Sequence, residues 1–221
     1  MSHPHIVAEA SVCGGHPLGS AFRGMPSAGS RHTVTTVSGA TSDWTFRRLD
    51  RADFPLLGRW LATPAMERWW HHEWTPEALE RDFGPTADGL EPAEDFVAVR
   101  DGAPVGIVQR YLLRDYPEYL AELRSVVAVP DGAASIDYGL GVPSLLGRGE
   151  GPAMIAAFVE RTWAALPEVT ELVVPVVAAN VASWRALEKA GFERVASGRL
   201  EPDNPVDDPL HHVLRRHRPS G

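Results

Sequence analysis

Strand-like patterns recur along residues 44–216 of this 221-residue chain. In several segments apolar and polar residues alternate, so that an extended chain has one apolar and one polar side. Residues 171–177 instead form a nearly continuous apolar run, which is typical of a strand buried on both faces. Asp101-Gly102 separates two of these segments and predicts a tight hairpin turn. The predicted strands are 44–49, 96–100, 104–113, 135–142, 171–177, 192–200 and 210–215.

Helical spacing of apolar residues and helix-boundary residues predict helices between these strands. Thr75-Pro76-Glu77 combines an N-cap residue, a proline at the first helical position and an acid in the first turn. Asn180 is a second N-cap residue, and Gly191 is a helix stop. The predicted helices are 51–62, 64–70, 75–83, 149–166 and 180–191.

The order of these elements predicts an α+β fold with a mixed, mostly antiparallel sheet flanked by helices. Residues 114–133 have no clean period and are expected to form a long excursion. Residues 1–43 contain only four charged residues and no sustained apolar period, so we expect a disordered N-terminal tail. The histidines and the cysteine of this tail match no zinc-ligand spacing, and no metal site is predicted. Residues 44–216 have the size of a single domain.

Charge and composition limit the possible partners. The net charge is −8, and all of it belongs to residues 44–221, because the tail carries two acids and two bases. Nucleic-acid-binding domains are usually basic, no apolar stretch approaches the ~20 residues of a membrane span, and no signal peptide is recognisable. We therefore expect a cytoplasmic protein without nucleic-acid or membrane partners. Its acidity suits a cationic small molecule, and its oligomeric state stays open.

The segment Leu-Leu-Gly-Arg-Gly-Glu-Gly-Pro-Ala at 145–153 joins a predicted strand to a long helix. Glycines allow the backbone to approach a ligand, and the first helical turn exposes N–H groups, so such a loop can hold a pyrophosphate. A tight strand-to-helix turn without a ligand would contain the same glycines. The loop lacks the Gly-Lys-Ser/Thr ending of a P-loop, and no acidic-ended second strand follows as in a Rossmann fold.

A second segment, from Asn180 to the sequence Lys-Ala-Gly-Phe at 189–192, accompanies this loop. Together they resemble the GCN5-related N-acetyltransferase (GNAT) superfamily over residues 134–216. The resemblance implies a GNAT fold, acetyl-CoA as co-substrate, a loop that binds its pyrophosphate and a helix beside its pantetheine arm. The coenzyme-binding residues that it implies are Leu140, Gly141, Val142, Arg148, Gly149, Glu150, Gly151, Pro152, Asn180 and Ser183.

Four upstream motifs extend the resemblance to residues 44–216. They are Glu67-Arg68-Trp69-Trp70, Pro104-Val105-Gly106, Gln109-Arg110-Tyr111 and Ser135-Ile136-Asp137. They resemble aminoglycoside 6′-N-acetyltransferases, which are antibiotic-resistance enzymes, and their siderophore-acylating relatives. This implies acetyl transfer to a primary amine of a polar small molecule, with Asp137 holding and deprotonating the amine. The substrate-binding residues implied are Trp69, Trp70, Gln109, Tyr111, Asp115 and Asp203.

The reaction requires three further groups. An amine must lose a proton before it attacks a thioester, and a carboxylate such as Asp137 can accept that proton. The thioester oxygen needs an N–H donor, for which we expect the backbone of Leu140 or Gly141. The tyrosine that often protonates the departing thiolate in this superfamily is replaced by Leu187, so Tyr138 becomes the candidate acid.

Other interpretations stay open. Asp137 could be a sheet-edge charge, and Trp69 and Trp70 could be core residues. An aspartate of the aminoglycoside enzymes is replaced by Pro175, and a siderophore or lysine-derived amine is the alternative acceptor. The leucine at 187 is also compatible with a catalytically degenerate module that binds an acyl-CoA without turnover.

Overall fold

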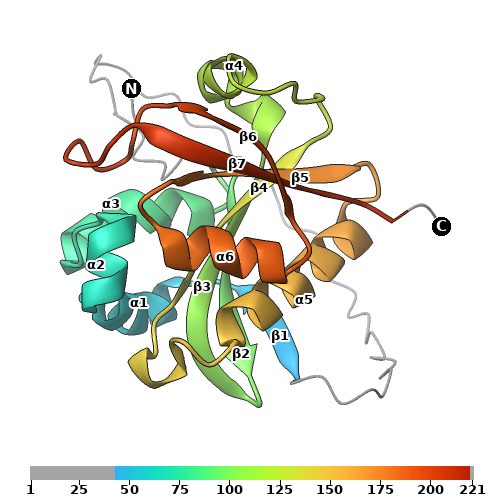
Figure 1. Ribbon diagram of the computed structural model, residues 1–221. Coiled ribbons are helices and arrows are strands. Elements are labelled where there is room, and N and C mark those ends of the chain that lie inside the picture. The colour runs from blue at the N-terminus through green and yellow to red at the C-terminus, as the bar shows by residue number, and fades with distance from the viewer. Residues whose placement is uncertain (1–42, 220–221) are drawn as a thin grey trace, which may run out of the picture. The chain divides into compact units, whose positions relative to one another are not determined.

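Seven strands form one sheet in the order β1-β2-β3-β4-β5-β7-β6 (Figure 1). The structure is a computed structural model that describes residues 43–219, so the prediction for the tail falls almost entirely outside the described residues. Neighbouring strands are antiparallel except for β4 and β5, which are parallel. The predicted α+β class is confirmed. The strands are β1 (Trp44–Arg48), β2 (Glu94–Arg100), β3 (Ala103–Leu112), β4 (Ala134–Leu140), β5 (Glu171–Val177), β6 (Glu193–Arg199) and β7 (Leu210–His217).

The predicted helices are also present. Thr75 Oγ1 accepts a hydrogen bond from the Ala78 N–H at 3.2 Å, and Asn180 Oδ1 accepts one from the Ser183 N–H at 3.2 Å, so both N-caps are confirmed. The α-helices are α1 (Phe54–Leu61), α2 (Pro64–Trp70), α3 (Pro76–Ala87), α4 (Pro117–Arg124), α5 (Glu150–Ala165) and α6 (Val181–Lys189). Short 3₁₀ helices are η1 (Arg51–Asp53), η2 (Leu113–Asp115) and η3 (Pro143–Leu145).

Two helices differ from the predictions. α4 lies inside the segment that was expected to be irregular, and its two turns bury only Leu120 and Leu123, too few positions to produce a readable period. α3 continues past the predicted end and contains Pro85. A proline inside a helix normally also clashes with the Cβ of the preceding residue, but here that residue is Gly84, which has no Cβ.

Helices cover both faces of the sheet. On one face, α5 and α6 bury a core that includes Phe158 and Leu187. On the other face, α1, α2 and α3 pack over β2 and β3 near Val97 and Ile107, and α4 packs over Tyr111. Burial of one such large apolar side chain contributes about 1.5–3 kcal/mol, so these clusters supply most of the folding free energy.

The sheet opens between β4 and β5. β3 and β4 pair along their length from Leu112 with Ala134 to Gly106 with Leu140, whereas β4 and β5 pair only at Ala134 and Leu172. The two parallel strands therefore diverge toward the end of β4. A gap at this position lets ligands reach backbone groups that an intact sheet would use for pairing.

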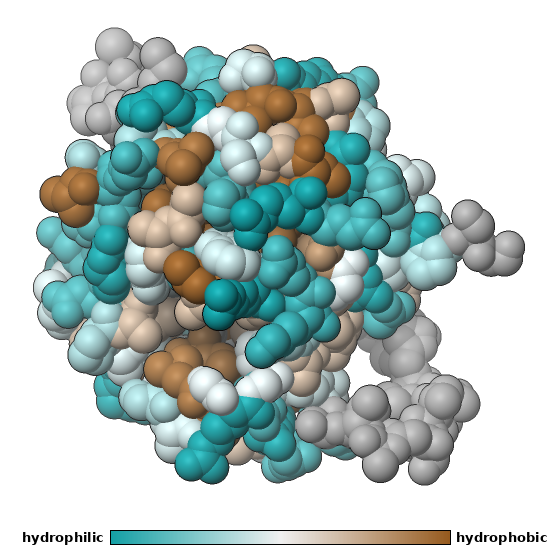
Figure 2. Space-filling view, in the orientation of Figure 1, coloured by the Kyte–Doolittle hydropathy of each residue, from teal (hydrophilic) through white to brown (hydrophobic). Residues whose placement is uncertain are grey.

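The surface is mixed in character. In the view of Figure 2, exposed apolar side chains form several small groups separated by polar ones. The exposed large apolar residues, among them Trp74, Leu90 and Val206, come from separate parts of the chain. None of the helices in residues 43–219 combines the length and the apolar composition needed to cross a bilayer.

Candidate active site

A pocket of about 350 Å³ opens where β4 and β5 diverge. Its walls come from α2, β4, β5, the start of α5, α6 and the loop between β6 and β7. The structure therefore brings together residues from segments far apart in the sequence. The predicted site residues that line this pocket are Trp69, Trp70, Asp137, Tyr138, Leu140, Gly151, Asn180, Ser183 and Asp203.

Asp137 lies on β4 and contributes a carboxylate to the pocket wall. Burial, followed by the charge of Asp137, raises the pKa of Tyr111 and of Tyr119, whose hydroxyls interact with each other. The charge of Asp203 raises the pKa of Tyr119 further. Asp137, Asp203 and two neutral phenols thus form one polar cluster, and its carboxylates can attract and deprotonate an amine.

Tyr138 follows Asp137 on β4, and its side chain packs with the core beneath α5 and α6. The Tyr138 hydroxyl lies 2.8 Å from Ser183 Oγ and donates to the Ser183 carbonyl oxygen at 3.2 Å. Burial raises the pKa of Tyr138, so this phenol carries its proton at neutral pH. Leu187 is fully buried in the same core and offers no proton. The structure therefore puts Tyr138 and Ser183, both predicted site residues, in direct contact.

The hydrogen bonds at the end of β4 distinguish between the two N–H groups, those of Leu140 and Gly141, that were expected to bind the thioester oxygen. The Gly141 N–H donates to the Val105 carbonyl oxygen at 2.9 Å, so it is already used and the expectation for this amide is wrong. In an antiparallel pair, alternate residues direct their N–H groups away from the partner strand. Leu140, which pairs with Gly106, therefore directs its N–H toward the gap beside β5.

Glycine is required at position 141 by close packing. A Cβ at Gly141 would lie 2.0 Å from the Trp60 ring, a distance that real Cβ atoms essentially never show. A Cβ at Gly139 would lie 2.3 Å from Met66 Sδ. These two glycines let α1 and α2 lie directly against the strand that carries Asp137.

The glycine-rich loop has left-handed backbone at two positions. Gly147 has a φ of 73° and Gly149 a φ of 86°, and a Cβ at either position would meet nothing within 4 Å. Their requirement for glycine is therefore conformational. Gly149 is the N-cap residue of α5 and makes no side-chain cap, which leaves the first N–H groups of the helix available to an anion.

Not all of the predicted coenzyme residues reach the pocket. Gly141, Val142, Arg148, Gly149, Glu150 and Pro152 are absent from its wall. Arg148 and Gly149 are exposed in the loop. The Glu150 carboxylate forms an ion pair with the Arg100 guanidinium, with 2.5 Å between Oε1 and Nη1. Pro152 has no N–H to offer. In the described loop, only Leu146, Gly147 and Gly151 line the pocket.

The two tryptophans of α2 have different environments. Trp70 is buried, and its Nε1–H donates to the Tyr138 carbonyl oxygen at 3.2 Å, so it belongs both to the core and to the pocket wall. Trp69 lies at the rim, with the Arg68 guanidinium 4.0 Å from its ring centroid. Arg68 also forms a bidentate pair with Asp207, whose second contact measures 2.9 Å. This pair joins α2 to the loop between β6 and β7 beside the pocket.

Three predicted substrate-binding residues do not line the pocket. Gln109 is buried beside Asp95, to which its Nε2 donates at 2.9 Å. Tyr111 is buried beneath α4, and Asp115 lies exposed on η2. Gln109 and Tyr111 share a sheet face with Asp137, but their strand is covered by α3 and α4. The sequence pattern predicts the shared face of these side chains, but it could not show how far the helices extend over that face.

The pocket residues that sequence reasoning did not single out include Met66, Asp207 and His211. His211 lies on β7, and its Nδ1 is 2.8 Å from the Pro209 carbonyl oxygen, which fixes the ring against the backbone. Asp207 belongs to an acidic loop in which only Asp203 was singled out. Within residues 43–219, no cluster of three or more His, Cys, Asp or Glu side chains could hold a metal ion.

Residues 50–200 match the family model described as Acetyltransferase (GNAT) domain, which covers most of the described chain. The chain belongs to this GNAT acetyltransferase family. This membership confirms the resemblance found in the sequence, and the protein is an acyltransferase. The chain is similar to aminoglycoside N(6')-acetyltransferase type 1 from Klebsiella pneumoniae and from Serratia marcescens. Each is 28% identical over 173 residues, covering 77% of this chain and 83% of the relative.

Several solved structures are also similar to this chain. Aminoglycoside acetyltransferase AAC(6')-Ib in complex with coenzyme A matches with a TM-score of 0.66 and 25% identity, over 80% of this chain and 95% of that one. The same enzyme with ribostamycin and coenzyme A matches with a TM-score of 0.66 and 26% identity, over 79% and 93%. A protein from Bacillus halodurans, 15% identical with a TM-score of 0.63 over 79% and 83%, shows only the shared fold.

Proposed function

We propose that this GNAT enzyme acetylates the 6′-amine of an aminoglycoside. Acetyl-CoA is the co-substrate, and acetyl transfer to an amine is the activity common to the relatives. The observation that carries the finer proposal is the grouping of Asp137 and Asp203 beside Trp69 in one pocket at the end of β4. Asp207 lines the same pocket, but its charge is paired with that of Arg68. Carboxylates attract a polycationic sugar, and an aromatic ring offers a surface for its apolar face.

The donor side of the pocket suits a long, flexible coenzyme. We assign the gap between β4 and β5 to the pantetheine arm, because Leu140 directs an unpaired strand N–H into it. The left-handed loop at Gly147 and Gly149 and the start of α5 suit the pyrophosphate. Asn180 and Ser183, at the start of α6, line the same wall.

The acceptor side supplies the base. Asp137 takes a proton from the acceptor ammonium, and the neutral amine then attacks the thioester carbonyl carbon. The C–N bond forms, the Leu140 N–H stabilises the oxyanion, and the C–S bond breaks. The Tyr138 hydroxyl, on the α6 side, donates its proton to the departing sulfur. The attacking nitrogen releases its second proton to water as the amide forms, and the Tyr138 phenolate takes a proton back from water. Most of the acceleration comes from holding amine and thioester together.

A lysine-derived amine, as in siderophore synthesis, is the second candidate acceptor. The observation that favours it is Pro175, which lines the pocket where the aminoglycoside branch has an aspartate. One fewer carboxylate weakens the attraction for a polyamine more than for a monoamine.

The deciding experiment measures thiol release from acetyl-CoA with a panel of acceptors. Kanamycin is expected to be a substrate, whereas paromomycin, which carries a hydroxyl at the 6′ position, is the matched control and is expected to be inert. Turnover of N6-hydroxylysine without turnover of kanamycin would transfer the assignment to the second candidate. Tight acetyl-CoA binding without thiol release from any amine would instead show a degenerate acyl-CoA-binding module.

A further inference from the structure

Three polar residues form a row across the sheet on the face that carries the proposed base. Asp95 on β2 lies directly opposite Gln109 on β3, and Gln109 lies directly opposite Asp137 on β4. Cross-strand partners have Cβ atoms about 4.5–5.5 Å apart, so neighbouring side chains of the row are within contact range. Asp95 and Gln109 are only 2% and 5% exposed. A buried polar row of this kind must satisfy its hydrogen bonds internally.

Asp95 is held by donors on both of its carboxyl oxygens. Gln109 Nε2 donates to Oδ1 at 2.9 Å, and the Thr86 hydroxyl contacts Oδ2. Burial raises the pKa of Asp95, and these two hydrogen bonds oppose that shift. A proton on Oδ2 would face Thr86, so Oδ1 accepts from Gln109 in either protonation state.

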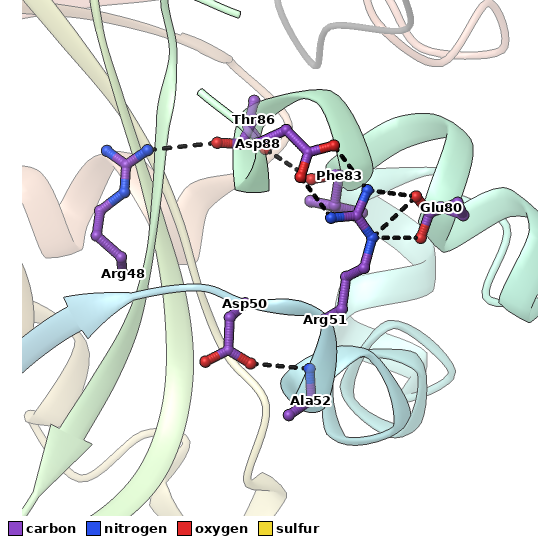
Figure 3. A network of polar contacts seen from close by, with 8 residues as sticks. All are labelled: Arg48, Asp50, Arg51, Ala52, Glu80, Phe83, Thr86 and Asp88. Carbon is purple, nitrogen blue, oxygen red and sulfur yellow. Dashed lines mark hydrogen bonds and ion pairs between the residues drawn. The ribbon is translucent and has the colours of Figure 1, made fainter. Parts of the chain in front are cut away.

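Thr86 is itself fixed, because the C-terminal end of α3 is tied to neighbouring elements. Figure 3 shows Arg51 bridging Glu80 and Asp88 and Arg48 reaching the Thr86 carbonyl oxygen at 3.4 Å. The Thr86 hydroxyl also lies 2.9 Å from the Phe83 carbonyl oxygen. Asp95 therefore has one well-defined position from which to orient Gln109.

The orientation of the Gln109 amide follows from this arrangement. The reverse orientation would direct the amide carbonyl at the acceptor oxygen of Asp95 and lose a buried hydrogen bond. The amide nitrogen therefore faces Asp95. Gln109 Oε1 is then buried without a hydrogen-bond partner among the described residues, on the strand next to Asp137. A buried carbonyl oxygen without a donor is costly, and a catalytic role is one of the explanations for retaining such an atom.

We propose that Asp95 is a positioning residue for proton transfer: it turns Gln109 Oε1 toward Asp137, where it accepts a hydrogen bond once Asp137 has taken the proton of the acceptor amine. This inference rests on the proposed role of Asp137 as the base. The proton leaves the ammonium nitrogen for a carboxyl oxygen of Asp137, and the new O–H group donates to Gln109 Oε1. No other bond changes, and the proton returns to solvent after the product leaves.

Other groups also face Asp137 and influence its titration. The phenols of Tyr111, Tyr119 and Tyr138 are kept neutral by burial, so they add no charge. Carboxylates in the pocket favour the protonated form of Asp137, and a protonated histidine would favour the carboxylate. These charged or titratable pocket residues are Asp203, Asp207 and His211. The substitutions chosen below change none of them.

Asp95→Asn tests the inference with little change in shape. Asparagine can direct its amide nitrogen at Gln109 Oε1, which lets the Gln109 NH2 group turn and donate to the Asp137 carboxylate. The carboxylate is then favoured over the protonated form. Following the Asp137 carboxyl carbon by NMR in the ligand-free full chain, we expect its titration midpoint to fall by about one pH unit. The acidic midpoint of kcat/KM for the acceptor should fall with it.

Matched variants separate this positioning role from a structural one. Thr86→Val removes the contact to Asp95 Oδ2 but keeps the Gln109 contact to Oδ1, so it should lower the Asp137 midpoint much less than Asp95→Asn does. Gln109→Met removes Oε1 and should lower the midpoint on its own, which keeps the inference testable even if Asp95→Asn does not fold. In the Gln109→Met background, Asp95→Asn should add no further shift, because Asp95 acts only through Gln109.

An unchanged midpoint in Asp95→Asn, or an equal fall in Thr86→Val, would overturn the inference. If only Gln109→Met folds, an unchanged midpoint in that variant overturns it equally. The NMR titration needs no acceptor, so it gives an answer even if no aminoglycoside is acetylated. Failure of the proposed function would instead appear as the absence of thiol release by the unsubstituted enzyme.

Discussion

The contact between Gly141 and Trp60 leads to a quantitative prediction for Gly141→Ala. The new Cβ would lie 2.0–2.3 Å from three atoms of the Trp60 ring, where ordinary contacts are 3.4–4 Å. Trp60, on the buried side of α1, is 4% exposed and packs in the core, so its ring has little room to move. The overlap has to be relieved by displacing the ring or the end of β4.

Overpacking of this kind typically costs about 1–3 kcal/mol, and the rigidity of a buried indole puts the expected value near the upper end. For a domain of this size, each kcal/mol lowers Tm by about 2–4 °C, so we expect a fall of roughly 5–10 °C. Turnover should fall as well, because the displaced segment carries the Leu140 N–H. Thermal unfolding followed by circular dichroism measures the first effect, and thiol release the second.

A double-mutant cycle with Trp60→Ala tests the cause. Removing the ring makes room for the methyl group, so Gly141→Ala should cost less than about 1 kcal/mol in that background. Trp60→Ala alone should cost about 3–5 kcal/mol, because it leaves a cavity in the core. An unchanged Tm for Gly141→Ala, or equal losses in both backgrounds, would refute the steric reasoning.

Three further substitutions address the proposed chemistry. Asp137→Asn should lower kcat by about 10²–10⁴-fold, since the general base is lost, while the Kd for acetyl-CoA measured by calorimetry stays nearly the same; full turnover would remove Asp137 from the mechanism. Gly149→Val should weaken acetyl-CoA binding because the left-handed loop is strained, and an unaltered Kd would contradict the assignment of the loop, with Gly149→Asn as a better tolerated control. Tyr138→Phe should slow the chemical step and leave both substrate affinities close to normal, and wild-type single-turnover rates would show that another group protonates the sulfur.

Local signals in the sequence predicted most of the fold. Asn180 and Thr75 mark helix starts by hydrogen bonds that form within three residues, so they can be recognised without knowledge of the tertiary structure. The glycine-rich loop was also recognisable from a short stretch of sequence, without knowledge of the tertiary structure. α4 was missed because its stability comes from Leu120 and Leu123 packing over Tyr111, a contact between segments that no local pattern contains.

The site was predicted less completely than the fold. Motifs singled out Asp137, Trp70 and Asp203, and all three line the pocket. Gln109 was expected in the pocket, but α3 and the Asp95 hydrogen bond hold it behind the wall. His211 was missed because its contribution depends on the pairing of β7 with β5, a long-range contact that single-sequence patterns do not specify.

Consecutive residues of β4 serve opposite faces of the sheet, because side chains alternate along a strand. Asp137 faces the proposed acceptor side, and Tyr138 faces α6 and the proposed coenzyme side. In the proposed reaction, the proton removed from the amine and the proton given to the sulfur are therefore handled on two sides of the sheet. Mutations on the α2 side can change which amine is accepted while the thiol-release machinery stays intact. Evolution of a new acceptor specificity in this enzyme requires remodelling of only one half of the catalytic centre.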